Sequence, residues 1–183
     1  MQHFVRLALL AVSLGFAATA SAEELVIPKG GYVVSSNLDL LPEPVRKKRD
    51  QLLAIAKTGD IEAFGPILDT DQTNVSFGAP EDKLAYLKKE SGDSEGIEML
   101  AFLAEILEAP YVATEGGDGK PFYAWPYFAG LDDLSVLTPE QLVDAYKILG
   151  HDGFEEQRDF GGWIWWRAYI GADGKLTAFV AGD

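Results

Sequence analysis

The residues best suited to ligand chemistry are aromatic and lie close together near the end of the chain. If residues 163–170 form a strand, alternate side chains point to one face, and this face carries Trp163, Trp165, Arg167 and Tyr169. Aromatic rings beside a forked guanidinium suit a sugar ring, or a cationic or aromatic ligand. Trp125 and Tyr127, in a second aromatic segment, could add to this surface. These six residues are the candidate ligand-binding set. The competing interpretation is burial between sheet and helices, where such rings usually lie.

One histidine, His151, could support acid-base catalysis. Asp152 and Asp159 are acidic neighbours that could partner its imidazole, although histidine after a helix is also favoured by the helix dipole alone. The chain contains no cysteine, and it lacks the GxSxG, HExxH, GxGxxG and P-loop motifs. The sequence therefore favours a protein without catalysis, cofactor or metal, and leaves His151, Asp152 and Asp159 as weak catalytic candidates.

Two charged groups have competing explanations. The run Arg46-Lys-Lys-Arg49 is a basic cluster near a predicted helix start, where it either contacts an anionic or protein partner or forms a solvated face. Asp69, Asp71 and Asn74 resemble the start of a calcium loop, but the glycine and the distal glutamate of such a loop are missing. A turn is the better explanation for these three residues.

The first 22 residues carry the features of a secretory signal peptide. Arg6 precedes an apolar run from Leu7 to Ala18, and Ala20-Ser-Ala22 supplies a small-residue cleavage site before Glu23. We expect cleavage at Ala22/Glu23, a periplasmic or secreted location, and one globular domain over residues 23–183. The apolar run is too short for a membrane span, so no transmembrane segment is expected.

The charge of the chain restricts its partners. Removing residues 1–22 leaves 14 basic and 29 acidic residues, a formal net charge of −15. This acidic balance disfavours nucleic acid, whose phosphates are bound by lysine and arginine. The negative charge is more compatible with a neutral or cationic partner, such as an envelope glycan, a small ligand or another envelope protein.

Several helices can be predicted from their ends and apolar periodicity. Thr138, Pro139 and Gln141 form a capping box with proline at the first helical position, predicting a helix over 139–149 that ends at Gly150. Asp93 or Ser94 caps a strongly apolar helix over 95–108. Further helices are predicted over 45–57, 60–68 and 80–90.

Strands are predicted mainly in the second half. Residues 111–114 resemble a strand, and residues 163–170 and 175–180 form a β-hairpin around Asp173-Gly174. The aromatic stretch 121–128 is expected to be extended but not a central strand, because Pro126 cannot donate a ladder hydrogen bond. No repeat, low-complexity tract or interdomain linker is evident.

Two resemblances extend these expectations. The segments Asn74-Val-Ser-Phe-Gly78, Tyr123-Ala-Trp-Pro-Tyr-Phe128 and Phe179-Val-Ala-Gly-Asp183 resemble a family of small exported bacterial proteins of unknown function. This likeness implies export and a complete domain, and no reaction or site residue. The helical run 54–63 followed by a sheet-rich final half is similar to NTF2-like cone domains, which include both isomerase-like enzymes and ligand binders.

Together these observations predict an α+β protein, with about five helices on a small antiparallel sheet that includes a C-terminal hairpin. An NTF2-like cone is the alternative architecture. The expected function is non-catalytic binding, or an envelope-associated role, through an aromatic surface or pocket. The alternative is an NTF2-like acid-base enzyme that uses His151.

Overall fold

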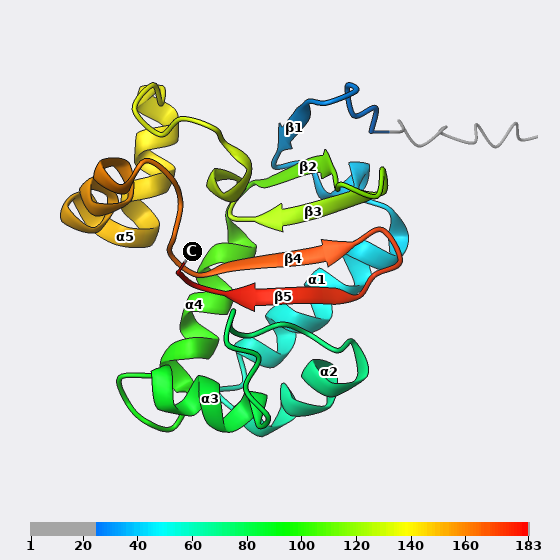
Figure 1. The fold of residues 1–183 in the computed structure, drawn as a ribbon, viewed down its shortest axis with the longest axis vertical. Coiled ribbons are helices and arrows are strands. Elements are labelled where there is room, and N and C mark those ends of the chain that lie inside the picture. Colours follow the sequence, from blue (N-terminus) through cyan, green and yellow to red (C-terminus); the bar gives the residue numbers. More distant parts are fainter. Residues whose placement is uncertain (1–24, 183) are drawn as a thin grey trace, which may run out of the picture.

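A computed structural model describes residues 25–182, so the predicted signal peptide at 1–22 lies outside the described residues. The described chain has the predicted α+β fold, with five α-helices and one five-stranded antiparallel sheet. The strands follow one another across the sheet in chain order, β1-β2-β3-β4-β5 (Figure 1). The turns that join β2 to β3 and β4 to β5 therefore lie at the same end of the sheet, because each antiparallel strand reverses the direction of the last.

The sheet is built from short strands. These are β1 (Tyr32–Ser35), β2 (Tyr111–Glu115), β3 (Pro121–Trp125), β4 (Arg167–Gly171) and β5 (Leu176–Val180). The predicted C-terminal hairpin is present as β4 and β5, although its first strand begins at Arg167 and not at Trp163.

The central strand of the sheet is β3, contrary to the expectation from Pro126. Pro121 is the first residue of β3 and Pro126 follows its last residue, Trp125. Neither proline interrupts the interior of the strand, where a missing N–H donor would break the ladder. A central strand is therefore compatible with both prolines, because each lies at an end of β3.

One face of the sheet is covered by two long helices, α1 (Glu43–Ala56) and α4 (Ile97–Glu108), which lie behind the sheet in Figure 1. Buried residues recur four and seven positions apart in α1, and three, four and seven positions apart in α4, the spacings of one helical face. The buried members are Val45, Leu52 and Ala56 of α1 and Met99, Leu100, Leu103, Ile106 and Leu107 of α4. They join the sheet residues Ala113, Ala168 and Ile170 in the larger hydrophobic core.

Two shorter helices pack below this layer in Figure 1. They are α2 (Gly65–Thr70) and α3 (Lys83–Glu90). The single helix predicted over 60–68 is divided into a 3-10 turn, η2 (Ile61–Ala63), and α2. Pro66 stands in the first turn of α2, a position that favours a new helix start.

The other face of the sheet is covered only in part, by α5 (Pro139–Phe160) and the short 3-10 helix η3 (Tyr127–Gly130). The predicted capping box of Thr138 and Gln141 is present. Gly150 has a non-helical backbone with φ of 68°, so the predicted end at this residue marks a kink, beyond which a second helical segment follows. Within residues 25–182, no helix combines the length and apolar character needed to cross a bilayer.

The start of α4 depends on one carboxylate. Asp93 accepts hydrogen bonds from the Ser91 hydroxyl and from the backbone N–H groups of Glu95, Gly96 and Glu98. Together these hydrogen bonds lower the pKa of Asp93 from 3.8 to about 2, and the bond from Ser91 makes the largest contribution.

A carboxylate whose pKa falls on folding stabilises the protein above its unfolded pKa and loses this effect as the pH falls through the folded value. We expect Asp93→Ala to lower the thermal midpoint at pH 7, and the gap from wild type to narrow between about pH 4 and pH 2. Thermal unfolding followed by circular dichroism at several pH values in this range measures the difference in midpoint. A gap that stays constant to pH 2 would contradict the assigned role.

Candidate functional site

The structure does not assemble the expected aromatic surface. Trp125 is fully buried beside Tyr111, with ring centroids 5.5 Å apart, and Tyr127 is buried against Phe128 at 4.1 Å. The Nε1 of Trp125 and the hydroxyl of Tyr127 have no hydrogen-bond partner among the described residues, and burial raises the pKa of Tyr127. Neither ring is presented to a ligand.

Trp163 and Trp165 also face other protein groups. Trp163 stacks on Phe128, with centroids 4.9 Å apart and planes 17° apart, and half-buried Trp165 packs edge-on against Phe102 at 5.3 Å. The physical reason lies before β4: the Oε1 of Gln157 accepts hydrogen bonds from the N–H groups of Ile164 and Trp165. Residues 163–166 therefore leave the strand ladder, and the period-two alternation that placed four side chains on one face does not apply to them.

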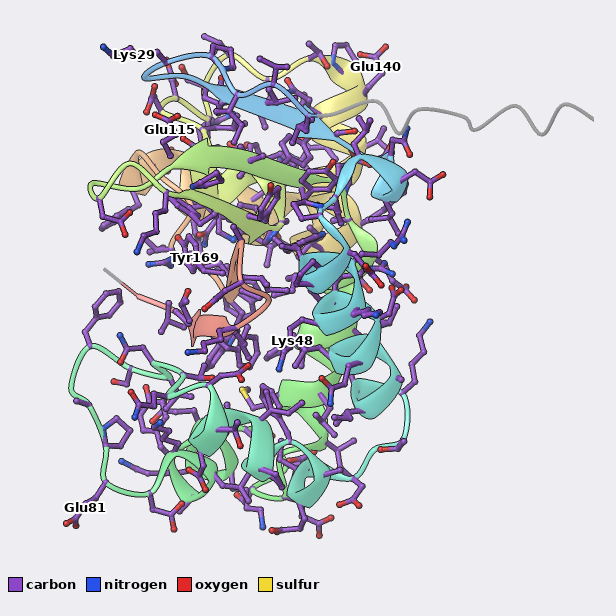
Figure 2. All side chains as sticks on the ribbon, turned by 90° about the vertical axis from the view of Figure 1, so that its right-hand side faces the viewer. Lys29, Lys48, Glu81, Glu115, Glu140 and Tyr169 are labelled. Carbon is purple, nitrogen blue, oxygen red and sulfur yellow. The ribbon has the colours of Figure 1, made fainter. Side chains whose placement is uncertain are left out.

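Arg167 and Tyr169 are the two members of the candidate set that share an accessible face. Both belong to β4 at alternate positions, on the face opposite α1 and α4. In Figure 2, Tyr169 and α1 lie on opposite sides of the sheet. Since α5 and η3 cover this face only in part, the end near the β2–β3 and β4–β5 turns stays open.

The three catalytic candidates lie on the surface of α5. The side chain of His151 is 66% exposed, pairs with the exposed Asp152 at 3.0 Å and lies beside the ring of Tyr146. Asp159 is exposed about two helical turns further on. His151 does not line either of the two hollows beside the sheet.

The basic cluster of α1 is engaged within the protein. Arg46 pairs with Asp39 at 3.2 Å and Lys47 with Glu43 at 2.6 Å. Lys48 forms a largely buried pair with Asp71 at 2.7 Å (Figure 2). Arg49 donates two hydrogen bonds to the Leu107 carbonyl at the end of α4. These contacts support neither a free basic patch nor an anionic partner.

The residues that resembled a calcium loop instead protect the edge of the sheet. Asp71 accepts a hydrogen bond from Leu176 N, Thr73 donates to Leu176 O, and Asn74 forms a parallel bridge to Ala178. They satisfy backbone groups on the outer side of β5, which an unprotected edge would expose. Among residues 25–182, no three histidine, cysteine, aspartate or glutamate side chains gather in a group that could hold a metal ion.

Two hairpin turns of the sheet match each other, a likeness that the sequence-based predictions did not include. Gly116-Gly-Asp-Gly-Lys120 joins β2 to β3, and Gly171-Ala-Asp-Gly-Lys175 joins β4 to β5. In each turn the first glycine donates to the lysine carbonyl, at 2.8 and 2.9 Å, and the aspartate accepts from the lysine N–H at 3.1 Å. The repeated Gly-x-Asp-Gly-Lys pattern was visible in the sequence, but a repeat of five residues is shorter than the supersecondary units for which repeats are usually sought.

The two turns border a hollow of about 750 Å³, which we call the turn hollow. Its floor includes Phe122 of β3 and Tyr169 of β4, whose ring centroids are 5.9 Å apart. Asp118 and Asp173 stand on its rim and are 61% and 62% exposed. Hydrogen bonds from the backbone and side chain of Lys120 lower the pKa of Asp118, so this carboxylate is ionised and accepts hydrogen bonds at neutral pH.

A second hollow of about 530 Å³ adjoins the first through Tyr169, and we call it the arginine hollow. It lies between β4, β5 and the loop that follows α2. Its lining includes the side chains of Asn74, Ser76, Phe77, Arg167 and Tyr169. Arg167 is 8% exposed and Phe77 is 66% exposed.

Together the two hollows offer aromatic rings on the floor and polar groups on the rim. Each lies within the range of about 300–1,000 Å³ usual for small-ligand sites. An open hollow of this composition can hold a flat polar molecule by stacking and hydrogen bonding. Comparison of the chain with protein-family models, curated proteins and solved structures gave no match.

Proposed function

We propose that this protein is an exported, non-catalytic binding protein that holds a sugar ring, or a similar flat polar molecule, in the turn hollow. Export is inferred from the leader at residues 1–22 and from the likeness to small exported bacterial proteins. The observation that carries the binding role is the pair of matching turns beside the exposed sides of Tyr169 and Phe122.

The composition of the turn hollow favours a sugar ring over a purely apolar ligand. Sugar rings have apolar C–H faces that can lie on aromatic rings, and their hydroxyls both donate and accept hydrogen bonds. Each turn carries one aspartate and one lysine, separated by 3.3 Å in one and 3.8 Å in the other. The rim thus supplies acceptors and donors with little net local charge.

An envelope glycan is the ligand that best agrees with both the hollow and the predicted location. The formal net charge of −15 without residues 1–22 disfavours strongly anionic polymers at long range.

Replacing Tyr169 by alanine should weaken glycan binding at least tenfold, because the variant loses a ring worth roughly 1.4 kcal/mol or more in stacking and burial. Isothermal titration with N-acetylglucosamine and glucose oligomers measures the affinity, and NMR shift changes locate the binding site. Phe160→Ala is the matched control, since Phe160 is an exposed aromatic on α5 away from both hollows.

Two results would reject the proposed function. One is the absence of binding to any oligomer in the set at millimolar concentration. The other is binding that Tyr169→Ala leaves unchanged, which would place the ligand elsewhere on the protein.

A further inference from the structure

Arg167 is a buried charge whose guanidinium faces the open side of the sheet. The residue is 8% exposed and lines the arginine hollow. Its Nη1 donates to the Trp165 carbonyl at 3.3 Å and its Nη2 to the Gly182 carbonyl at 2.6 Å. These two hydrogen bonds to backbone carbonyls fix the orientation of the guanidinium.

No carboxylate balances this charge among residues 25–182. None of the ion pairs formed by these residues includes Arg167. The centre of the Phe77 ring lies 6.0 Å from the guanidinium carbon, a cation–π distance. Arginine stays protonated at any ordinary pH, and buried charges are normally paired.

The neighbours of Arg167 complete a polar recess. Asn74 and Ser76 line the same hollow and bring an amide and a hydroxyl to it. Guanidinium groups bind carboxylates with parallel N–H···O bonds, so a guanidinium that has no carboxylate partner among residues 25–182 and lines a recess is suited to a carboxylate ligand. Tyr169 lines this recess and the turn hollow alike, so one ligand can contact both.

We infer that the arginine hollow receives the carboxylate of an acidic sugar, such as a uronic acid, whose ring lies against Tyr169. The inference rests on the proposed function and adds the chemical class of the ligand. The net negative charge of the protein opposes an acidic ligand only at long range, because salt screens charges beyond about 8 Å under physiological conditions. Direct contact with Arg167 acts within that distance.

The test compares acidic and neutral sugars of the same size. Titrations use galacturonic acid trimer and galactose trimer, with wild type, Arg167→Gln and Arg167→Lys. We expect wild type to bind the acidic trimer at least tenfold more tightly than the neutral one. Arg167→Gln should lose this preference but keep the affinity for the neutral trimer. Arg167→Lys should retain part of the preference. Asp183→Asn is included because Asp183 follows Gly182 in the sequence, and it should keep the preference.

A readout in wild type keeps the inference testable if Arg167→Gln does not fold. The Nε–H resonance of Arg167 should shift on addition of the acidic trimer but not of the neutral one, and raising the salt from 50 to 500 mM should reduce the preference. Equal affinity of wild type for the two trimers would overturn the inference while leaving the proposed function standing. Absence of binding to either, and to the neutral oligomers above, would overturn both.

Discussion

Replacing Asp71 by asparagine is expected to lower the free energy of unfolding by about 3 kcal/mol, because it leaves the charge of Lys48 without its buried partner. The two side chains are 2.7 Å apart, and only 15% of Lys48 and 6% of Asp71 are exposed. Asparagine keeps an oxygen that can still accept from Leu176 N, a bond of 2.9 Å in the structure. Urea unfolding, with tryptophan fluorescence as the signal, measures the change.

Two further variants separate the buried charge from other effects. Glu43→Gln removes the partner of Lys47 in an exposed pair, 67% and 74% accessible, and should change stability far less than Asp71→Asn, because solvent screens exposed ion pairs. The double variant Lys48→Met/Asp71→Asn should recover much of the loss, because no uncompensated charge remains. A single Asp71→Asn variant as stable as wild type would show that the pair is solvated in solution.

The same pair joins distant parts of the fold that border the candidate site. Lys48 belongs to α1, and Asp71 follows α2 and binds the start of β5. The next residues, Thr73 and Asn74, bind the outer edge of β5, and Asn74 also lines the arginine hollow. The buried pair therefore positions one wall of the hollow as well as stabilising the sheet edge.

Replacing Trp163 by alanine is expected to cost about 3–5 kcal/mol, the usual range for removing a buried aromatic side chain. Trp163 is 6% exposed, stacks on Phe128 and donates through Nε1 to the Trp166 carbonyl at 3.3 Å. Urea unfolding measures this cost. Phe160→Ala removes an aromatic side chain that is 53% exposed, and should stay within about 0.5 kcal/mol of wild type.

The Trp163 variant also distinguishes a core role from a ligand-binding role. Under conditions in which the variant remains folded, its affinity for sugar oligomers should match that of wild type, since Trp163 lines neither hollow. A variant of normal stability with lost binding would instead support the interpretation of Trp163 as a surface ligand contact.

Local sequence signals predicted most of the helices well. The capping box at Thr138 and Gln141 is present. The N-cap residue of α4 is Gly96, not the predicted Asp93 or Ser94, although Asp93 accepts backbone hydrogen bonds just ahead of this helix, and the apolar residues of the helix enter the core as predicted. These features depend on residues within a few positions of one another, so chain chemistry alone decides them. The turn at Asp173-Gly174 was predictable for the same reason, and Gly174 has φ of 80°.

The aromatic site could not be predicted in the same way. Whether Trp163 and Trp165 face solvent depends on Gln157, Phe128 and Phe102, which come from other segments of the chain. Alternation along a strand says which side chains share a face only where a strand exists, and the ladder begins at Arg167.

The amino-acid sequence by itself determined the α+β class, the helix caps, the tight turns and the acidic charge, because propensity, periodicity and composition act over short distances. Only the tertiary structure decided that two similar turns, 55 positions apart in the chain, stand at one end of the sheet and border a hollow floored by Tyr169. It likewise decided that the basic residues of α1 are paired and that Arg167 is not paired among residues 25–182. The physical reason is that strand order and long-range packing, which bring distant segments together, set the surroundings of each side chain.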